Sequence, residues 1–215
     1  MLKLYTYFRS SAAYRVRIAL NLKGLAFEPE VIWLPAGEQS EHAYTDVNPQ
    51  ALVPTLIDGD LTVAQSLAIL EYLDERYPQR PLLPTDIAGR ARVRSLALLV
   101  ACDIHPINNL RILKYLRGAL GQGEEAVNAW YRHWCDAGLS AYERELERGP
   151  GPYSHGDAVT IADCCLVPQV FNAQRFDVDM SRYPRVMAVN DACLAQDAFA
   201  RAAPMAQPEA GESRG

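Results

Sequence analysis

The sequence lacks the features of a membrane, secreted or nucleic-acid-binding protein. No apolar run in its 215 residues approaches the roughly 18 that a membrane span needs, and the longest, around Leu96–Cys102, is about seven. Residues Met1–Tyr5 lack the apolar core of a signal peptide. The net charge of -5 offers no general basic face for nucleic acid. With 49% hydrophobic residues, the composition predicts a globular cytoplasmic protein with a substantial core and with no nucleic-acid or membrane partner.

Cysteine usage also excludes several classes of protein. The five cysteines are odd in number, so a complete set of internal disulfides is impossible. No CxxC pair or Cys/His cluster has the spacing of zinc ligands, so we expect no metal. The adjacent pair Cys164 and Cys165 could suggest metal or redox chemistry, but we favour core packing because cysteine is among the most buried residue types. The expected compartment is the reducing cytosol.

Positive charge is concentrated in two places within this acidic chain. Arg9, Arg15 and Arg17 stand together with no acidic residue nearby. The second group consists of Arg90, Arg92, Arg94, Arg111, Lys114 and Arg117, with only Asp103 among them. Such islands suggest a small anionic ligand. Solvated helix faces are the plainer interpretation, and we favour it for most of these residues.

The first eighty residues alternate between strand and helix patterns. The predicted strands are Leu2–Tyr7, Phe27–Leu34, Leu52–Ile57 and Leu61–Val63, the last two joined by the turn Asp58-Gly59-Asp60. A helix is predicted from Ser10-Ser11 to about Leu22, with Gly24 as its stop, and another from Ser66 to about Tyr77. The predicted order is therefore βαβ, a connecting segment and then ββα, over residues 1–80.

After residue 80 the patterns are helical. Proline-bounded residues 80–84 form a predicted linker, and helices are expected at about 87–118, 124–147, 160–175 and 185–200. Thr160 and Asp163 form a capping box, so Asp163 is expected to be structural. We predict an all-α domain over 87–203. The end of the chain, 204–215, is rich in Pro, Gly, Ala and Glu and is predicted to be disordered.

Chemistry is suggested where the first strand meets the first helix. Ser10 and Ser11 lie at the predicted helix N-terminus, where unpaired amides and the positive end of the helix dipole favour an anion. A serine hydroxyl there could hydrogen-bond a thiolate and lower its pKa. Alternatively, one of the serines only caps the helix.

Two further signals follow in the same domain. If the Val53–Pro54 bond is cis, Val53 presents backbone N–H and C=O groups to a peptide-like ligand. Gln65 and Ser66 lie at a helix N-terminus, where amide, hydroxyl and backbone N–H groups can bind a carboxylate. Each signal is weak alone, but three in this order within a βαβ–ββα frame are unlikely to coincide by chance.

These motifs resemble those of the glutathione transferases, and more narrowly those of the zeta class. The resemblance rests on the runs Arg9–Leu20 and Ala101–Arg111 and covers nearly the whole chain. It implies a thioredoxin-like α/β N-terminal domain, an all-α C-terminal domain and a homodimer. The zeta pattern usually reads Ser-Ser-Cys, whereas this chain has Ala12 at the cysteine position. Any role of that thiol must then fall to the serines, the helix amides and glutathione.

The resemblance also implies which residues form the site. The expected glutathione-binding residues are Ser10, Ser11, Ala12, Gln39, Val53, Gln65, Ser66, His105, Asn109 and Arg111. Ser10, Ser11 and Arg9 are the expected catalytic residues, and Arg9 and Arg175 are expected to bind a dicarboxylate substrate, since arginine binds a carboxylate bidentately. His105, next to Pro106, could instead cap or kink a long helix.

The activity implied by the resemblance is a glutathione-dependent cis–trans isomerisation of maleylacetoacetate or maleylpyruvate to the fumaryl isomer. Thiolate addition, rotation about the resulting single bond and elimination would regenerate glutathione. An alternative is a broader transferase that acts on electrophiles such as α-haloacids. A third possibility is a glutathione-fold binding module without catalysis, which intact arginines and an intact Gln65-Ser66 pair disfavour.

Overall fold

The computed structural model describes residues 1–149 and 151–211, and the chain divides into two compact units. Among the described residues, the first unit contains Met1–Leu82 together with Leu194–Gly211, and the second lies within Leu83–Cys193. The sequence placed a boundary at residues 80–87, close to the observed one. It did not place the end of the chain with the N-terminal residues, and the structure corrects this assignment.

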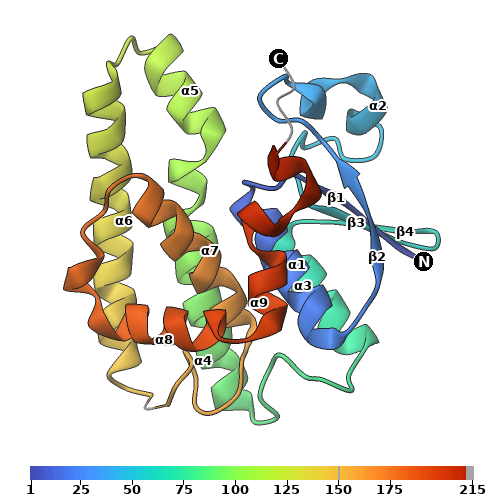
Figure 1. Cartoon of the computed structure of the whole chain (residues 1–215), viewed down its shortest axis with the longest axis vertical. Helices are drawn as coiled ribbons and strands as arrows, with labels where there is room; N and C mark the ends of the chain where they lie inside the picture. The colour runs from blue at the N-terminus through green and yellow to red at the C-terminus, as the bar shows by residue number, and fades with distance from the viewer. Residues whose placement is uncertain (150, 212–215) are drawn as a thin grey trace. The chain divides into compact units, whose positions relative to one another are not determined.

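The first unit is built on a four-stranded sheet with the strand order β2-β1-β3-β4 (Figure 1). The strands are β1 Leu2–Thr6, β2 Phe27–Val31, β3 Thr55–Asp58 and β4 Leu61–Ala64. β1 runs parallel to β2 and antiparallel to β3, which pairs antiparallel with β4. Side chains of β1 alternate between buried and half-buried, so that Leu2, Leu4 and Thr6 face the core. This is the predicted βαβ–ββα order on a thioredoxin-like sheet.

Helices α1 and α3 lie side by side against this sheet (Figure 1). The helices of the first unit are α1 Ser11–Lys23, α2 His42–Thr45, α3 Ser66–Arg76 and α9 Asp197–Ala202. α1 begins after the N-cap Ser10 and ends at Gly24, whose φ of +69° is the left-handed conformation that glycine tolerates. Both ends of this helix confirm the prediction.

The second unit is helical, and its described residues between 83 and 193 form no strand. Its helices are α4 Ile87–Leu98, α5 Leu110–Gly118, α6 Glu124–Leu146, α7 Ile161–Arg175 and α8 Pro184–Leu194. The predicted capping box opens α7: Thr160 Oγ1 accepts from the N–H of Ala162 at 3.3 Å, and Asp163 Oδ2 accepts from the N–H of Thr160 at 2.8 Å. Asp163 is fully buried, as a structural residue would be.

The stretch predicted as one helix over 87–118 is interrupted. A π-helical turn, η2 (Leu99–Ile104), and a 3-10 turn, η3 (Pro106–Asn108), separate α4 from α5. Pro106 has no N–H and cannot continue the α-helical ladder. One 18-residue window within Ile87–Gly118, with a mean hydropathy of 1.3, is by length and composition alone apolar enough to cross a membrane, a test that core helices of water-soluble domains also pass.

Three other boundaries differ from the prediction by more than one residue. The helix expected over 185–200 is broken after Leu194, and α9 starts at Asp197. The second strand ends at Val31 instead of Leu34, because Ile32 and Trp33 are buried in an aromatic cluster. The third strand starts at residue 55, since the proline before it cannot donate to the ladder.

The prediction of a disordered end is wrong for residues 204–211. They form two 3-10 turns, η5 (Pro204–Ala206) and η6 (Pro208–Gly211). Pro204 and Glu209 are buried, so the segment packs into the first unit despite its composition. Residues 212–215, which fell within the same prediction, lie outside the described residues.

Candidate functional site

The turn between β1 and α1 has the form that an anion-binding site needs. Ser10 is the N-cap of a 13-residue helix, and its Oγ accepts from the N–H of Ala13 at 3.2 Å. The N–H of Ser10 donates to the carbonyl of Tyr7 at 2.9 Å. Ser11 is buried and Ala12 half-buried. Ser10 is therefore the helix cap, and a hydroxyl that accepts one hydrogen bond can still donate its proton to a ligand.

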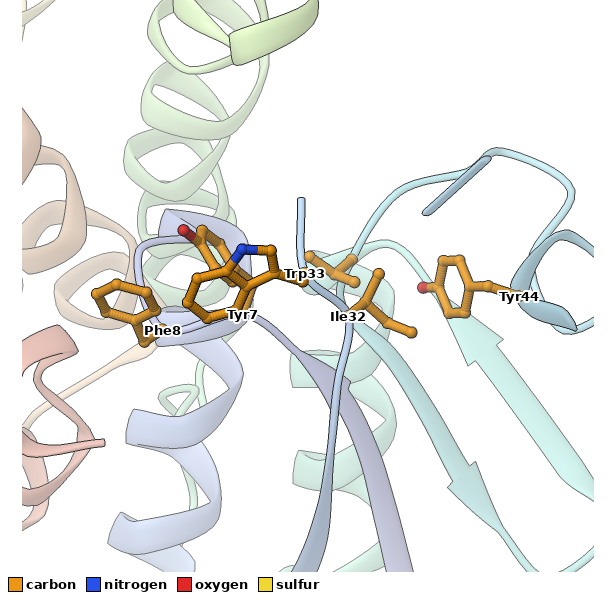
Figure 2. Close-up of a cluster of buried hydrophobic side chains, with 6 residues drawn as sticks. Tyr7, Phe8, Ile32, Trp33 and Tyr44 are labelled. Atoms are coloured by element: carbon orange, nitrogen blue, oxygen red, sulfur yellow. The ribbon is translucent and has the colours of Figure 1, made fainter. Parts of the chain in front are cut away.

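Aromatic side chains pack next to this turn. The buried cluster consists of Tyr7, Phe8, Ile32, Trp33, Tyr44 and Val53 (Figure 2). The rings of Phe8 and Trp33 stack with their centroids 6.1 Å apart. The exposed Arg9 places its guanidinium carbon 5.0 Å from the centroid of the Phe8 ring. A cation–π contact with an anchored ring thus orients the arginine beside Ser10.

The loop before β3 presents peptide groups. The Val53–Pro54 bond is cis, as the prediction required. Neither the N–H nor the C=O of Val53 makes a hydrogen bond to another described residue. The preceding carbonyl, of Leu52, accepts from Tyr44 Oη at 2.6 Å and from Asn48 Nδ2 at 2.7 Å. These two bonds hold the loop in place, and Val53 shares the cluster with Tyr7 and Phe8.

The start of α3 combines a strained backbone with a buried cation. Gln65 has φ +69° and ψ 117°, outside the conformations that a non-glycine residue favours. Its Nε2 donates to Gln50 Oε1 at 2.7 Å. Ser66 is buried, and its Oγ accepts from Arg15 Nη1 at 3.1 Å. A buried guanidinium behind the first turn of α3 adds to the positive potential of that helix N-terminus, which suits a carboxylate.

Arg15 and Arg17 correct the expectation of solvated helix faces. Their side chains are 2% and 1% exposed, although both belong to the basic island read from the sequence. Arg15 reaches Ser66, and Arg17 donates to backbone carbonyls. Within this island only Arg9 is exposed to solvent.

Gln39 supplies an unsatisfied acceptor. It lies in the 3-10 turn η1 (Glu38–Ser40), which is anchored by a 2.6 Å bond from the N–H of Trp33 to Glu38 Oε2. Gln39 Oε1 is buried and has no hydrogen-bond partner among the described residues. A buried amide oxygen in this state is unusual in a folded protein, and Gln39 Oε1 is available to accept a hydrogen bond from a bound molecule.

The other predicted glutathione contacts lie in the second unit, around η3. His105 follows the π-helical turn, and its N–H donates to the carbonyl of Val100 at 2.9 Å. Asn109 is the N-cap of α5 and accepts from the N–H of Arg111 at 3.1 Å. Trp130 Nε1 donates to the carbonyl of Ile107 at 2.9 Å and holds the turn. His105 therefore stands at a helix break, as the alternative interpretation proposed, and a ligand role for its side chain stays a prediction.

Arg175 lies in the last turn of α7, where the helix dipole favours a cation. It is exposed, and its Nη1 donates to Asn172 Oδ1 at 3.0 Å. Its guanidinium carbon lies 6.0 Å from the ring centroid of Phe171 and 5.8 Å from that of Phe176. The side chain is thus oriented by an amide and two rings.

Within the first unit, the structure brings the predicted segments together: Val53 belongs to the same buried cluster as Tyr7 and Phe8, and Arg15 joins α1 to Ser66. In the second unit, His105, Asn109 and Arg111 gather around η3, and Arg175 lies on α7. Sequence reasoning missed the residues that hold these segments, namely Tyr44, Asn48, Arg15 and Arg17. The Asn-Pro turn signal at residues 48–49 could have identified Asn48.

Two other features carry no part of this site. A surface hollow of about 780 Å³ lies between the end of α6 and α8, lined among others by Leu146, Tyr153, Arg185 and Val189. No predicted site residue lines it. Among the described residues, no group of three or more His, Cys, Asp or Glu side chains is arranged to hold a metal.

A thioredoxin-like sheet, a serine-capped helix N-terminus and Val53 peptide groups without a partner among the described residues form the arrangement that a protein of the glutathione-binding class needs. Two family models agree. The one described as "Glutathione S-transferase, N-terminal domain" matches residues 4–81, and the one described as "Glutathione S-transferase, C-terminal domain" matches residues 124–189. The chain belongs to the glutathione S-transferase family.

Several relatives are similar to this chain over nearly its whole length. A probable maleylacetoacetate isomerase of Vibrio cholerae is 53% identical, over 96% of this chain and 97% of the relative. A solved bacterial maleylpyruvate isomerase of the zeta class is 52% identical with a TM-score of 0.94, over 96% and 99% of the two chains. A maleylacetoacetate isomerase of Methylobacterium extorquens, solved with malonate and glutathione, is 43% identical with a TM-score of 0.95, over 98% and 100%.

Proposed function

We propose that this chain is a glutathione-dependent cis–trans isomerase that converts maleylacetoacetate or maleylpyruvate into the fumaryl isomer. The observation that carries the proposal is the β1–α1 turn, where a serine-capped helix N-terminus directly follows an exposed arginine. This arrangement suits a thiolate next to a carboxylate-bearing substrate. Relatives with these two names match nearly the whole chain, which supports the same reaction class.

The residues of the first unit fit glutathione along its length. Ser10 and Ser11 would hold the sulfur, with the amide of Ala12 nearby. The backbone of Val53, which has no partner among the described residues, would pair with the cysteinyl peptide groups. Gln65 and Ser66 would bind the γ-glutamyl carboxylate in front of the buried Arg15. Gln39, with its unsatisfied Oε1, would also contact glutathione, as would His105, Asn109 and Arg111.

When bound, glutathione supplies a thiolate that adds to the cis double bond, leaves a single bond free to rotate, and departs from the trans isomer. The residues of this chain make that chemistry possible at neutral pH. Ser10 Oγ, as cap, keeps a proton to donate toward the sulfur, and the first-turn amides of α1 add positive potential. Both favour the ionised thiol and lower its pKa.

Arg9 and Arg175 would bind the two carboxylates of the substrate. Each guanidinium is exposed and oriented by an aromatic ring. A planar fork binds a carboxylate through two parallel hydrogen bonds. The malonate in the relative from Methylobacterium extorquens is itself a small dicarboxylate, which supports this class of substrate.

The test is the loss of maleylpyruvate absorbance with and without glutathione. We expect turnover only when glutathione is present, and no turnover of either maleyl substrate would refute the proposal. Ser10→Ala should lower kcat and leave KM for the substrate nearly unchanged, whereas Arg175→Ala should raise that KM. Conjugation of glutathione to an α-haloacid, with neither maleyl substrate consumed, would favour the broader transferase.

We further propose a homodimer in the cytoplasm. The dimer rests on the family resemblance alone and is tested by sedimentation equilibrium. All five cysteines are present as thiols, and four of them are buried, which suits a reducing compartment.

A further inference from the structure

The C-terminal segment, Leu194–Gly211, belongs to the same unit as the β1–α1 turn, although both family models end before it. Its helix α9 lies along α1 (Figure 1). Three α1 side chains donate to carbonyls of α9: Tyr14 Oη to Phe199 at 3.5 Å, Asn21 Nδ2 to Ala198 at 3.0 Å and Arg17 Nε to Ala202 at 3.1 Å. The first helix of the unit is therefore held by the last.

Arg17 is the residue of this contact that also reaches the candidate site. Its Nη1 donates to Thr6 Oγ1 at 3.0 Å and to the carbonyl of Tyr7 at 3.3 Å, and its Nη2 donates to the carbonyl of Phe8 at 3.0 Å. The carbonyl of Tyr7 also accepts from the N–H of Ser10. One buried guanidinium thus fixes the end of β1 and the two peptide groups that lead into Arg9 and the cap.

The charge of Arg17 is retained in this environment. Burial lowers the pKa of Arg17 to about 10, and the nearby carboxylate of Glu209 opposes that shift. Glu209 is itself 5% exposed and lies in η6 of the same segment. The guanidinium stays protonated at neutral pH, so all of its hydrogen bonds to carbonyl oxygens are charge-assisted. A lysine has its donors on one nitrogen and cannot reproduce this fork.

We propose that Arg17 is a positioning residue for the thiol end of the glutathione site, and that the C-terminal segment completes this site by anchoring the Arg17 guanidinium. The inference rests on the proposed function. If the carbonyls of Tyr7 and Phe8 move, the Ser10 hydroxyl and the first amides of α1 move with them. A displacement of about 1 Å at a reacting group can cost on the order of 100-fold in rate.

The test compares three variants of the full chain. Arg17→Lys keeps the charge and removes the fork, and Thr6→Val removes one acceptor of Arg17 with little change in shape. Arg201→Gln is the control, because Arg201 is an exposed residue of α9 that pairs only with Asp197 among the ion pairs of the described chain. For each we would measure the Kd for glutathione by calorimetry, the pKa of the bound thiol by thiolate absorbance, kcat, KM for maleylpyruvate and the thermal midpoint.

We expect Arg17→Lys to raise the pKa of the bound thiol toward that of free glutathione and to lower kcat at least about tenfold, with KM for maleylpyruvate changed less than about threefold. Thr6→Val should move the same quantities in the same direction by less, and Arg201→Gln should match the wild type. A residue that serves stability alone would shift the thermal midpoint and leave the thiol pKa of the folded protein unchanged.

A folded Arg17→Lys protein with wild-type thiol pKa and kcat overturns the inference. If that variant does not fold, Thr6→Val decides, and wild-type values there overturn it as well. Glutathione binding by the wild type separates the two proposals. A wild type that binds no glutathione refutes the proposed function and this inference together, whereas a wild type that binds it alongside unaffected variants refutes this inference alone.

Discussion

Replacing Gln65 by glycine should make the protein more stable and bind glutathione less tightly. Gln65 holds φ +69° and ψ 117° at the start of α3, a conformation that costs a non-glycine residue about 1–3 kcal/mol. Glycine relieves that strain. Its more flexible unfolded chain lowers the free energy of unfolding by about 0.5–1 kcal/mol, which offsets part of the gain. The net gain is about 1 kcal/mol, or about 2–4 °C in Tm for a chain of this size. Calorimetric unfolding measures it.

The side chain has the opposite effect on binding. If Gln65 hydrogen-bonds the charged γ-glutamyl end as proposed, loss of its amide should cost about 1.5–3 kcal/mol, roughly 10–150-fold in Kd. Gln65→Ala is the matched control, because it loses the same amide and the same bond to Gln50 but keeps the strained backbone. We expect Gln65→Ala and Gln65→Gly to bind glutathione equally weakly, with only the glycine variant more stable. A glycine variant no more stable than the alanine variant would refute the strain argument.

Three further predictions concern charge and burial. Arg9→Lys should raise KM for the dicarboxylate about tenfold with Kd for glutathione unchanged, because lysine lacks the planar fork; an unchanged KM would exclude Arg9 from the clamp. Lys23→Met should lower the free energy of unfolding in urea by about 3–5 kcal/mol, because the Lys23 ammonium is buried in an ion pair with Asp74. The control is Lys3→Met, which removes an exposed ion pair with Glu30 and should change the free energy of unfolding by less than about 0.5 kcal/mol. A disulfide reagent at pH 8 should modify only Cys102 in the native protein, because the other thiols are buried and burial raises the pKa of Cys135 to about 12; a second fast thiol would contradict this burial.

Structural features that depend only on nearby residues could be predicted from the sequence. The Ser10 cap, the Gly24 stop and the Thr160–Asp163 box depend on partners no more than four residues away, and each is confirmed. The order of strands and helices along the first eighty residues followed from the spacing of apolar residues and one Asp-Gly turn, whereas the order of the strands within the sheet is known from the structure. The family resemblance then named site residues that no local pattern identifies, such as Gln39.

Long-range contacts could not be predicted. Arg17 looked like part of a solvated face because its partners include backbone carbonyls, which leave no mark in the sequence, and one of them, that of Ala202, is 185 residues away. The composition of residues 204–211 suggested disorder, yet Glu209 is buried near Arg17. The positive φ of Gln65 could not be predicted from the sequence either, since a glutamine side chain does not require it. For Arg17 and for residues 204–211, contacts with distant parts of the chain decide the local structure.

The first unit is made of two segments that are separated in the sequence by the whole second unit. This separation sets an order of events during protein synthesis. When residue 82 has been translated, the partners that α1 finds in α9 do not yet exist. At roughly 5–20 residues per second, translation of the second unit takes on the order of ten seconds, and the residues of α9 are made only after it. A chain released early, before residue 194, carries Ser10, Ser11 and Gln65 but lacks the Ala202 carbonyl and the Glu209 carboxylate that hold Arg17 from the C-terminal segment. Firm retention on immobilised glutathione should therefore distinguish completed chains from prematurely terminated ones.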